Sequence, residues 1–154
     1  MAGEITVFQA VTLAVAVVGA VLGIVNLWLA FDNRRVKLRV VPAHAIPLGA
    51  AASDLRFCIE VTNLSSFPLT IENAGVYYAD GLKGMAVNPV FADGGSWPRR
   101  LEPRSSLTVY SQIPYSDRGS KIRFAYAKTQ CGRVQRGTSP ALRQIIKATP
   151  STRP

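Results

Sequence analysis

The chain contains few residues that could carry catalytic or metal chemistry, namely one histidine, His44, and two cysteines, Cys58 and Cys131. A zinc site needs about three or four converging ligands, and we expect these three residues to lie apart in the fold. No serine lies in the strand–turn–helix motif of an activated nucleophile. The pair Gly94 and Gly95 lacks the lysine and the helix of a phosphate-binding loop. We therefore predict no catalytic residue, no metal site and no cofactor, and we interpret the protein as non-enzymatic.

The two cysteines also bear on the cellular compartment. Residues 55–62 alternate between apolar and polar types, and Cys58 falls on the polar phase, while Cys131 lies in a predicted hairpin turn. Neither is expected to point into a core, so we do not expect a disulfide of the antibody type. Two reduced thiols agree with a cytoplasmic location. There Asn63, although it begins a glycosylation sequon, is better interpreted as a turn residue.

An apolar segment near the N-terminus predicts how the rest of the chain is anchored. Residues 5–31 form a run of 27 residues without a charge, preceded only by the stub 1–4. At about 1.5 Å of rise per residue, such a helix is about 40 Å long and exceeds the roughly 30 Å of bilayer hydrocarbon. The run predicts one transmembrane helix.

Charges on either side of this segment predict its orientation. The stub carries only the acidic Glu4, whereas Arg34, Arg35, Lys37 and Arg39 lie in or directly after the link 32–35. Basic residues remain on the cytoplasmic side, so we predict an external N-terminus and a cytoplasmic C-terminal domain. A cleavable signal peptide is the alternative, but the segment lacks a basic leader and is longer than the usual apolar region.

Small and polar residues lie along one side of the predicted helix. Helices in lipid associate where small residues let their backbones approach and where amides bond across the contact. The stripe is therefore a candidate interface with a second copy, as in a homodimer, or with a partner helix. The alternative interpretation is that the stripe has no such role, because glycine and alanine are common in membrane helices. The candidate interface residues are Gln9, Thr12, Ala16, Gly19, Gly23 and Asn26.

Residues 36–147 predict one domain of mainly β structure. Period-two alternation separated by turn residues is typical of an antiparallel β-sandwich. Residues 140–146 predict either a short helix or an edge strand, and we expect the tail 148–154 to be flexible. The candidate strands are residues 36–40, 55–62, 69–71, 75–79, 85–91, 107–113, 122–128 and 133–137.

One segment carries a resemblance to a known class of protein. The stretch IEVTNLSSFPLTIENAGVYYADG, residues 59–81, resembles the V-x-N-x-S-x-x-P-x-x-I-x-x-x-G segment of immunoglobulin-like β-sandwich modules in bacterial and phage envelope proteins. The order of apolar helix, basic residues and β domain also looks like that of single-pass membrane proteins of bacteria and their phages. The resemblance implies an immunoglobulin-like fold and implies no active-site residue.

The net charge of +9 is unevenly distributed. From Arg118 to the C-terminus there are nine basic residues and no acidic one. Such a region is either an ordinary solvated surface or a cationic face for the anionic headgroups of a bilayer, worth on the order of 1 kcal/mol per residue close to the surface. Nucleic acid ranks lower as a partner, since Phe124 and Tyr126 occupy apolar phases and form no recognisable stacking platform. The predicted membrane-surface residues are Arg34, Arg35, Lys37, Arg39, Lys121, Arg123, Arg133 and Arg136.

Two functions fit these features. The first is a noncatalytic, single-pass membrane protein whose cytoplasmic sandwich acts as an adaptor for a protein partner that the sequence does not identify. The second is a pilin-like or virion subunit that assembles through its apolar helix. The residues Met1, Ala2 and Gly3 would then be a very short leader, but they contain no basic residue and four basic residues follow the helix. Determination of the mature N-terminus distinguishes the two.

Overall fold

The structure is a computed structural model that describes residues 6–46, 54–86, 88–116 and 119–148. The chain divides into two compact units, one ending at Arg35 and the other beginning at Val36. The predicted stub 1–4, the start of the apolar run at Ile5 and the tail beyond Ala148 lie outside the described residues.

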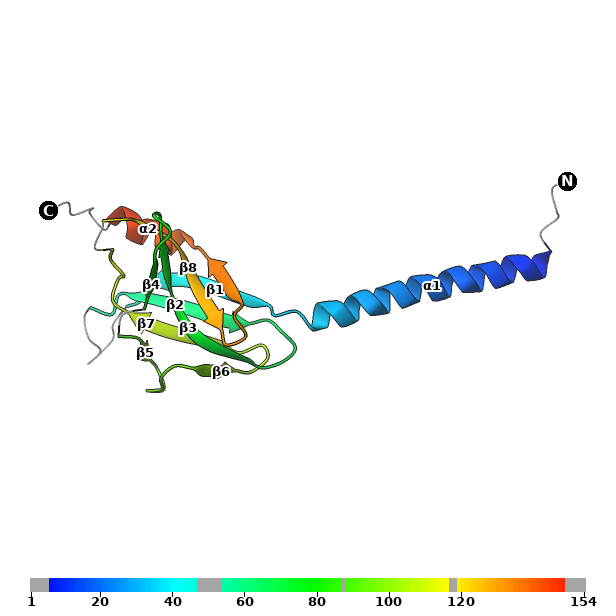
Figure 1. Cartoon of the computed structure of the whole chain (residues 1–154), viewed down its shortest axis with the longest axis horizontal. Helices are drawn as coiled ribbons and strands as arrows, with labels where there is room; N and C mark the ends of the chain where they lie inside the picture. The colour runs from blue at the N-terminus through cyan, green and yellow to red at the C-terminus, as the bar shows by residue number, and fades with distance from the viewer. Residues whose placement is uncertain (1–5, 47–53, 87, 117–118, 149–154) are drawn as a thin grey trace. The chain divides into compact units, whose positions relative to one another are not determined.

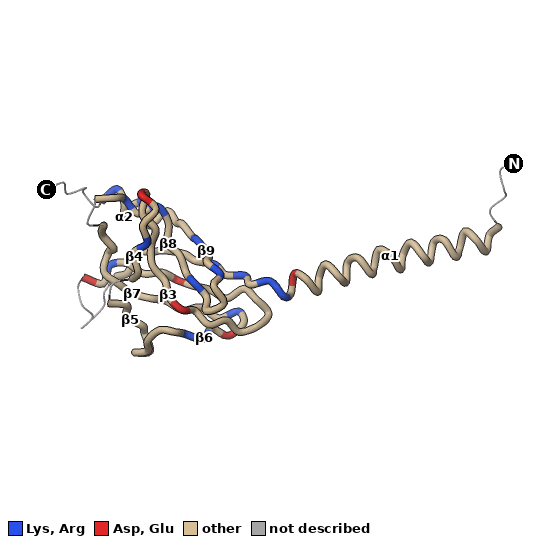
Figure 2. Tube along the Cα trace, viewed as in Figure 1, with Lys and Arg blue, Asp and Glu red and all other residues tan. Residues whose placement is uncertain are grey.

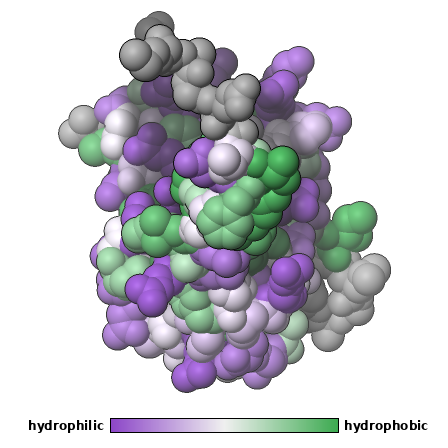
Figure 3. Space-filling view, turned by 90° about the vertical axis from the view of Figure 1, so that its right-hand side faces the viewer, coloured by the Kyte–Doolittle hydropathy of each residue, from purple (hydrophilic) through white to green (hydrophobic). Residues whose placement is uncertain are grey.

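The first unit is the helix α1, Val7–Asn33 (Figure 1). It is long and apolar enough to cross a membrane, and none of its residues is buried. Its apolar side chains appear in green in Figure 3. A signal sequence near an N-terminus can pass the same test of length and hydropathy. The helix ends two residues later than predicted because the charge of Asp32 ends the apolar run without preventing helical backbone, and Arg34 then caps the helix by donating its N–H to Phe31 O at 3.2 Å.

The second unit is a sandwich-like arrangement of two antiparallel sheets (Figure 1). In the first sheet the strands follow the order β1-β2-β7-β5. Apolar residues on neighbouring strands stand opposite each other and share the inner face, because directly paired residues project to the same side of a sheet. The bounds are Leu38–His44 for β1, Phe57–Asn63 for β2, Ser106–Ser111 for β7 and Val90–Phe91 for β5.

The second sheet has the order β4-β3-β8-β9, and β6 pairs with β3 outside this path. Strand β3 is its longest member and pairs with β4, β6 and β8. The bounds are Lys83–Met85 for β4, Leu69–Tyr78 for β3, Ile122–Thr129 for β8, Val134–Gly137 for β9 and Arg99–Leu101 for β6.

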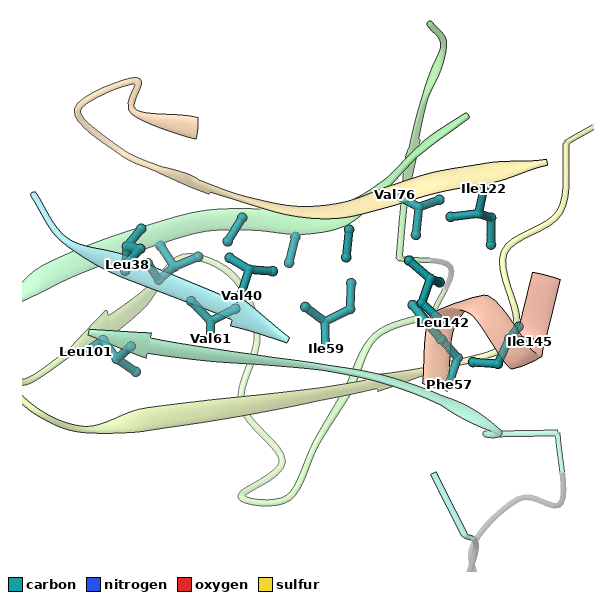
Figure 4. Packing of buried hydrophobic residues seen from close by; sticks show 14 of the residues in the cluster. Leu38, Val40, Phe57, Ile59, Val61, Val76, Leu101, Ile122, Leu142 and Ile145 are labelled. Carbon is teal, nitrogen blue, oxygen red and sulfur yellow. The ribbon is translucent and has the colours of Figure 1, made fainter. Parts of the chain in front are cut away.

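The facing sides of the two sheets form a hydrophobic core (Figure 4). Phe57, Ile59 and Val61 project from β2, and all three are at most 1% exposed. Full burial of such a side chain contributes roughly 1.5–3 kcal/mol relative to its exposure. Residues 125 and 127 of β8 are both alanine and are also completely buried, so this strand contributes little volume to the core.

A short helix, α2 (Pro140–Ala148), packs against the same core. Ser139 caps it, because its Oγ accepts a hydrogen bond from Leu142 N at 3.1 Å and donates one to Pro42 O. Leu142 and Ile145 are at most 1% exposed and lie beside Phe57 (Figure 4). Of the two predicted alternatives for this segment, the helix is confirmed.

The side chain of Asn63, in the segment 59–81, is a buried polar group with hydrogen-bond partners. The Nδ2 of Asn63 donates to the carbonyl oxygens of Phe67, Leu101 and Glu102 at 2.9, 3.1 and 3.2 Å. Its Oδ1 accepts the N–H of Ser65 at 2.9 Å. Asn63 is fully buried, so it is a structural residue at the turn after β2, and its role there agrees with the turn predicted from the sequence.

Three strand predictions differ from the structure. The predicted strands 69–71 and 75–79 form the single strand β3, whose register shift near Glu72 absorbs the break in alternation. The predicted strand 85–91 is divided between β4 and β5 in different sheets, since Asn88 has a φ of 47° and Pro89 has no N–H for pairing. The three-residue strand β6 was not predicted, because its two arginines hide any apolar alternation.

Candidate functional site

Aromatic and cationic side chains gather on the outer face of the second sheet, the side away from the core. The Tyr77 ring lies 4.9 Å from the Phe124 ring and 5.0 Å from the Tyr126 ring, measured between centroids. Register places Tyr77 opposite both Lys83 and Phe124, and it places Tyr126 opposite Arg136. We call the six residues Tyr77, Lys83, Arg123, Phe124, Tyr126 and Arg136 the aromatic–cationic face.

Three cations of this face lie over its rings. The guanidinium carbon of Arg136 is 4.8 Å from the Phe124 centroid and 5.2 Å from that of Tyr77. Arg123 lies 5.9 Å from Phe124, and the Nζ of Lys83 lies 5.3 Å from Tyr77. Each contact is within the range of cation–π attraction, which is worth about 0.5–1 kcal/mol at exposed sites. The rings therefore hold three positive groups together on one surface.

A β-bulge produces this arrangement. Tyr78 pairs with Ile122 and Tyr77 with Phe124, so Arg123 is an extra residue in β8. The bulge lets Ile122, Ala125 and Ala127 face the core while Phe124 and Tyr126 face outward. We predicted these two aromatics at apolar phases. Because strict alternation does not continue across a bulge, both lie outside the core cluster, although Tyr126 is still only 4% exposed.

The face is positively charged without compensation from nearby carboxylates. Among the described residues, neither Arg123, Arg136 nor Lys83 forms an ion pair, whereas Lys128 at the margin pairs with Glu72 at 2.8 Å. Figure 2 shows the basic positions along β8 and β9. Burial, followed by the proximity of Tyr77, raises the pKa of Tyr126, so this hydroxyl stays neutral at physiological pH. Such a surface attracts anions.

Exposed apolar side chains border the face on both sides. Met85 of β4 is 57% exposed and Val134 of β9 is 38% exposed. Register puts Met85 opposite Gly75 and Val134 opposite Lys128. A side chain at Gly75 would collide with the β4 backbone, since its Cβ would lie 2.8 Å from the Met85 Cα. Glycine at this position thus lets β4 pass close to the face.

The structure brings only part of the predicted membrane-surface set together. Arg123 and Arg136 belong to the aromatic–cationic face, but Lys121 and Arg133 flank opposite ends of β8. Arg39 is exposed and pairs with a residue of β2 in the other sheet. Of the remaining members, Arg34 and Arg35 belong to the first unit, and the N–H of Lys37 donates to Ser65 Oγ at 2.8 Å.

Tyr77 and Lys83 were missed as site residues. Tyr77 lies in the sequence Val76-Tyr77-Tyr78-Ala79, where either tyrosine could face the core, and Lys83 follows the turn at Gly81. The two residues become neighbours only through the β3–β4 pairing. Aromatic and basic residues do lie close together in the sequence of these strands. The pattern alone, however, does not show on which face of the sheet each side chain lies.

The predicted stripe on α1 is exposed along its length. Two of its polar side chains have partners within the helix region, as Gln9 Oε1 accepts the N–H of Thr6 at 3.1 Å and Thr12 Oγ1 donates to Phe8 O at 2.9 Å. A Cβ at Gly19 would meet no atom within 4 Å. These local bonds remove part of the reason for polar pairing, and association through the stripe stays a prediction.

The two cysteines have contrasting environments, and both are free. Cys58 faces away from the core cluster but is only 8% exposed, and burial raises the pKa of its thiol. Cys131 is exposed in the β8–β9 turn, where its Sγ lies 3.1 Å from Thr129 Oγ1. The hydrogen bond with Thr129, followed by one from the Arg133 backbone, lowers the pKa of the Cys131 thiol. Cys131 is therefore the accessible and more reactive of the two.

Within the described part of the chain, no three histidine, cysteine, aspartate or glutamate side chains lie close enough to hold a metal ion. His44 is exposed at the end of β1, while Cys131 lies in the turn after β8. A scan against protein-family models gives no match for this chain, and a search of curated proteins finds no similar sequence.

Proposed function

We propose that the protein is a noncatalytic adaptor anchored in a membrane by α1, with an immunoglobulin-like sandwich on the cytoplasmic side that binds a protein partner. The observation that carries this proposal is the division of the chain into an apolar helix with no buried residue and a domain with a core of its own. An exposed apolar helix of 27 residues requires a nonpolar environment. A lipid bilayer supplies one.

The connection between the two units is short. Helix α1 ends at Asn33 and β1 begins at Leu38. The four residues between them span at most about 14 Å when extended. The domain of an inserted chain would therefore remain next to the headgroups, where a partner bound to it would also be held.

The strand order supports the immunoglobulin-like part of the proposal. Immunoglobulin sandwiches place strands A, B, E and D in one sheet and C, F and G in the other. The orders β1-β2-β7-β5 and β4-β3-β8-β9 correspond to this arrangement if β4 is an additional edge strand. The free state of both cysteines agrees with a reducing cytoplasm.

Membrane anchoring is tested by alkaline carbonate extraction of vesicles that contain the full chain. We expect the protein to remain with the lipid pellet, since the contact of an inserted helix with lipid does not depend on charge. Release into the supernatant would contradict insertion, as would a mature protein that lacks α1.

Orientation is tested with the native thiol of Cys131. A membrane-impermeant maleimide applied to spheroplasts should label the protein only after lysis, and Cys131→Ser should abolish the labelling because Cys58 is buried. Equal labelling before and after lysis would place the domain outside and would favour the pilin-like alternative.

The adaptor role is tested by proximity labelling from the full-length protein. The control is a fusion of residues 1–35, which contain α1, to the same labelling enzyme. We expect neighbours that are labelled only when the sandwich is present. Identical neighbours for both proteins would contradict an adaptor function while leaving the anchoring intact.

A further inference from the structure

We infer that the aromatic–cationic face binds the anionic phospholipid headgroups of the membrane that holds α1, so that the sandwich lies with its second sheet toward the bilayer. This inference rests on the proposed anchoring. It assigns a ligand class to Tyr77, Lys83, Arg123, Phe124, Tyr126 and Arg136 and gives the domain a defined orientation.

The charge of the face calls for an anionic ligand. Arg136 and Arg123 lie 4.8 and 5.9 Å from the same Phe124 ring, so their guanidinium carbons are no more than about 11 Å apart. Neither forms an ion pair among the described residues. Contact with the rings restricts these side chains before any ligand arrives, which lowers the entropy that binding would otherwise cost. Lipid phosphates suit guanidinium groups because two N–H donors can bind two phosphate oxygens.

The apolar margins of the face favour lipid over nucleic acid. Met85 and Val134 are exposed on its two sides. Burial of such apolar side chains at the boundary of headgroups and acyl chains is favourable. Nucleic acid would instead need free ring surfaces for base stacking. Here Arg136 lies over both Tyr77 and Phe124, and Tyr126 is only 4% exposed.

The position of β9 brings the face within reach of the membrane. A Cβ at Gly137 would lie 1.8 Å from Val40 O, so β9 and β1 pass in direct contact where the two sheets meet. Val40 is the third residue of β1, and Arg136 directly precedes Gly137. The face therefore borders the strand through which the chain enters the domain, and a link of about 14 Å is long enough to let that side turn toward the bilayer.

This orientation leaves the outer face of the first sheet free. That face carries Glu60, Thr62 and Thr108 as well as Arg39, and it is less basic than the second sheet. A protein partner of the adaptor would then approach the first sheet. The two faces would divide membrane binding and partner binding between them.

The test uses the full chain labelled with a fluorophore at Cys131, which lies at the turn between β8 and β9. The protein is reconstituted in vesicles of phosphatidylcholine alone or of phosphatidylcholine mixed with phosphatidylglycerol, with an energy acceptor on the headgroups. We expect more energy transfer in the anionic vesicles, and we expect this difference to disappear near 1 M salt, where the Debye length is about 3 Å.

Matched charge variants separate the face from the overall basicity of the protein. Arg123→Gln with Arg136→Gln should lower the ratio of docked to undocked domain roughly 30-fold, as expected for two cations near an anionic surface. Arg143→Gln with Lys147→Gln removes the same charge from exposed positions of α2 and should change the ratio less than about twofold. Unfolding monitored by Trp97 fluorescence, in chains that also carry Trp28→Phe, verifies that each variant is folded.

Three results would overturn the inference. One is equal energy transfer in anionic and neutral vesicles, and another is an equal effect of the two double variants. The third is binding of a single-stranded oligonucleotide in neutral vesicles that is lost in Arg123→Gln with Arg136→Gln, without any response to anionic lipid. Failure of the anchoring itself would appear separately, as release of the full chain by carbonate.

Discussion

Replacement of Asn63 by alanine should strongly destabilise the sandwich. The side chain of Asn63 donates to three carbonyl oxygens and accepts the N–H of Ser65. The bonds to Leu101 O and from Ser65 N are buried, and each group left without its partner costs about 1–3 kcal/mol. We therefore expect a loss of about 2–6 kcal/mol, a large part of the roughly 5–15 kcal/mol that stabilises a small domain.

Urea unfolding of the full chain in detergent micelles measures this loss. Trp28→Phe leaves Trp97 as the single tryptophan, and Trp97 reports on the domain because its ring lies 5.0 Å from that of Phe91. With a urea m value of about 2 kcal/mol/M, Asn63→Ala should lower the unfolding midpoint by about 1–3 M.

Asn73→Ala is the matched control for this prediction. The buried Oδ1 of Asn73 has no hydrogen-bond partner among the described residues, so its removal should change the stability by less than about 1 kcal/mol. A cost for Asn63→Ala no larger than that for Asn73→Ala would refute the assignment of Asn63 as a buried structural polar group.

Two further changes test local features of the domain. Ser139→Ala removes the hydroxyl that accepts the N–H of Leu142 and should cost about 1 kcal/mol. The same urea assay measures this cost, with Ser96→Ala at an exposed position as the comparison, and an unchanged midpoint would show that the cap is dispensable. The lowered pKa of Cys131 should place its half-maximal alkylation rate at a lower pH than for a free cysteine, and Thr129→Val should move it upward because the thiolate loses a hydrogen bond. The thiol of Cys58, whose pKa is raised by burial, should react much more slowly at every pH, and equal rates at the two positions would contradict the structure.

Much of the fold could be predicted from patterns that are local in the sequence. The uncharged run gave α1, because a helix of apolar residues needs only length and composition to be recognised. The alternation in residues 55–62 gave β2, and the turn residues after it gave its end at Asn63. The division of residues 85–91 between two sheets was not predictable in this way, since β4 pairs with residues of β3 that precede it by 6 to 10 positions, whereas β5 pairs with residues of β7 that follow it by 18 to 20 positions.

The site was only partly predictable because it depends on pairing between distant strands. Arg123 and Arg136 were identified by their charge, but their common surface requires the β8–β9 register and the rings of β3. Tyr77 was missed for the same reason. The bulge at Arg123 had the larger effect, since one extra residue reverses the faces of all residues that follow it.

The bulge also connects the core with the surface of the second sheet. Because Phe124 and Tyr126 face outward, β8 fills its share of the core with Ile122 and two alanines, and large apolar side chains must come from elsewhere. Helix α2 supplies two of them, Leu142 and Ile145, beside Phe57 and near Ile122 (Figure 4). The core beside this end of β8 is therefore completed by the side chains of α2 and not by aromatic residues of β8.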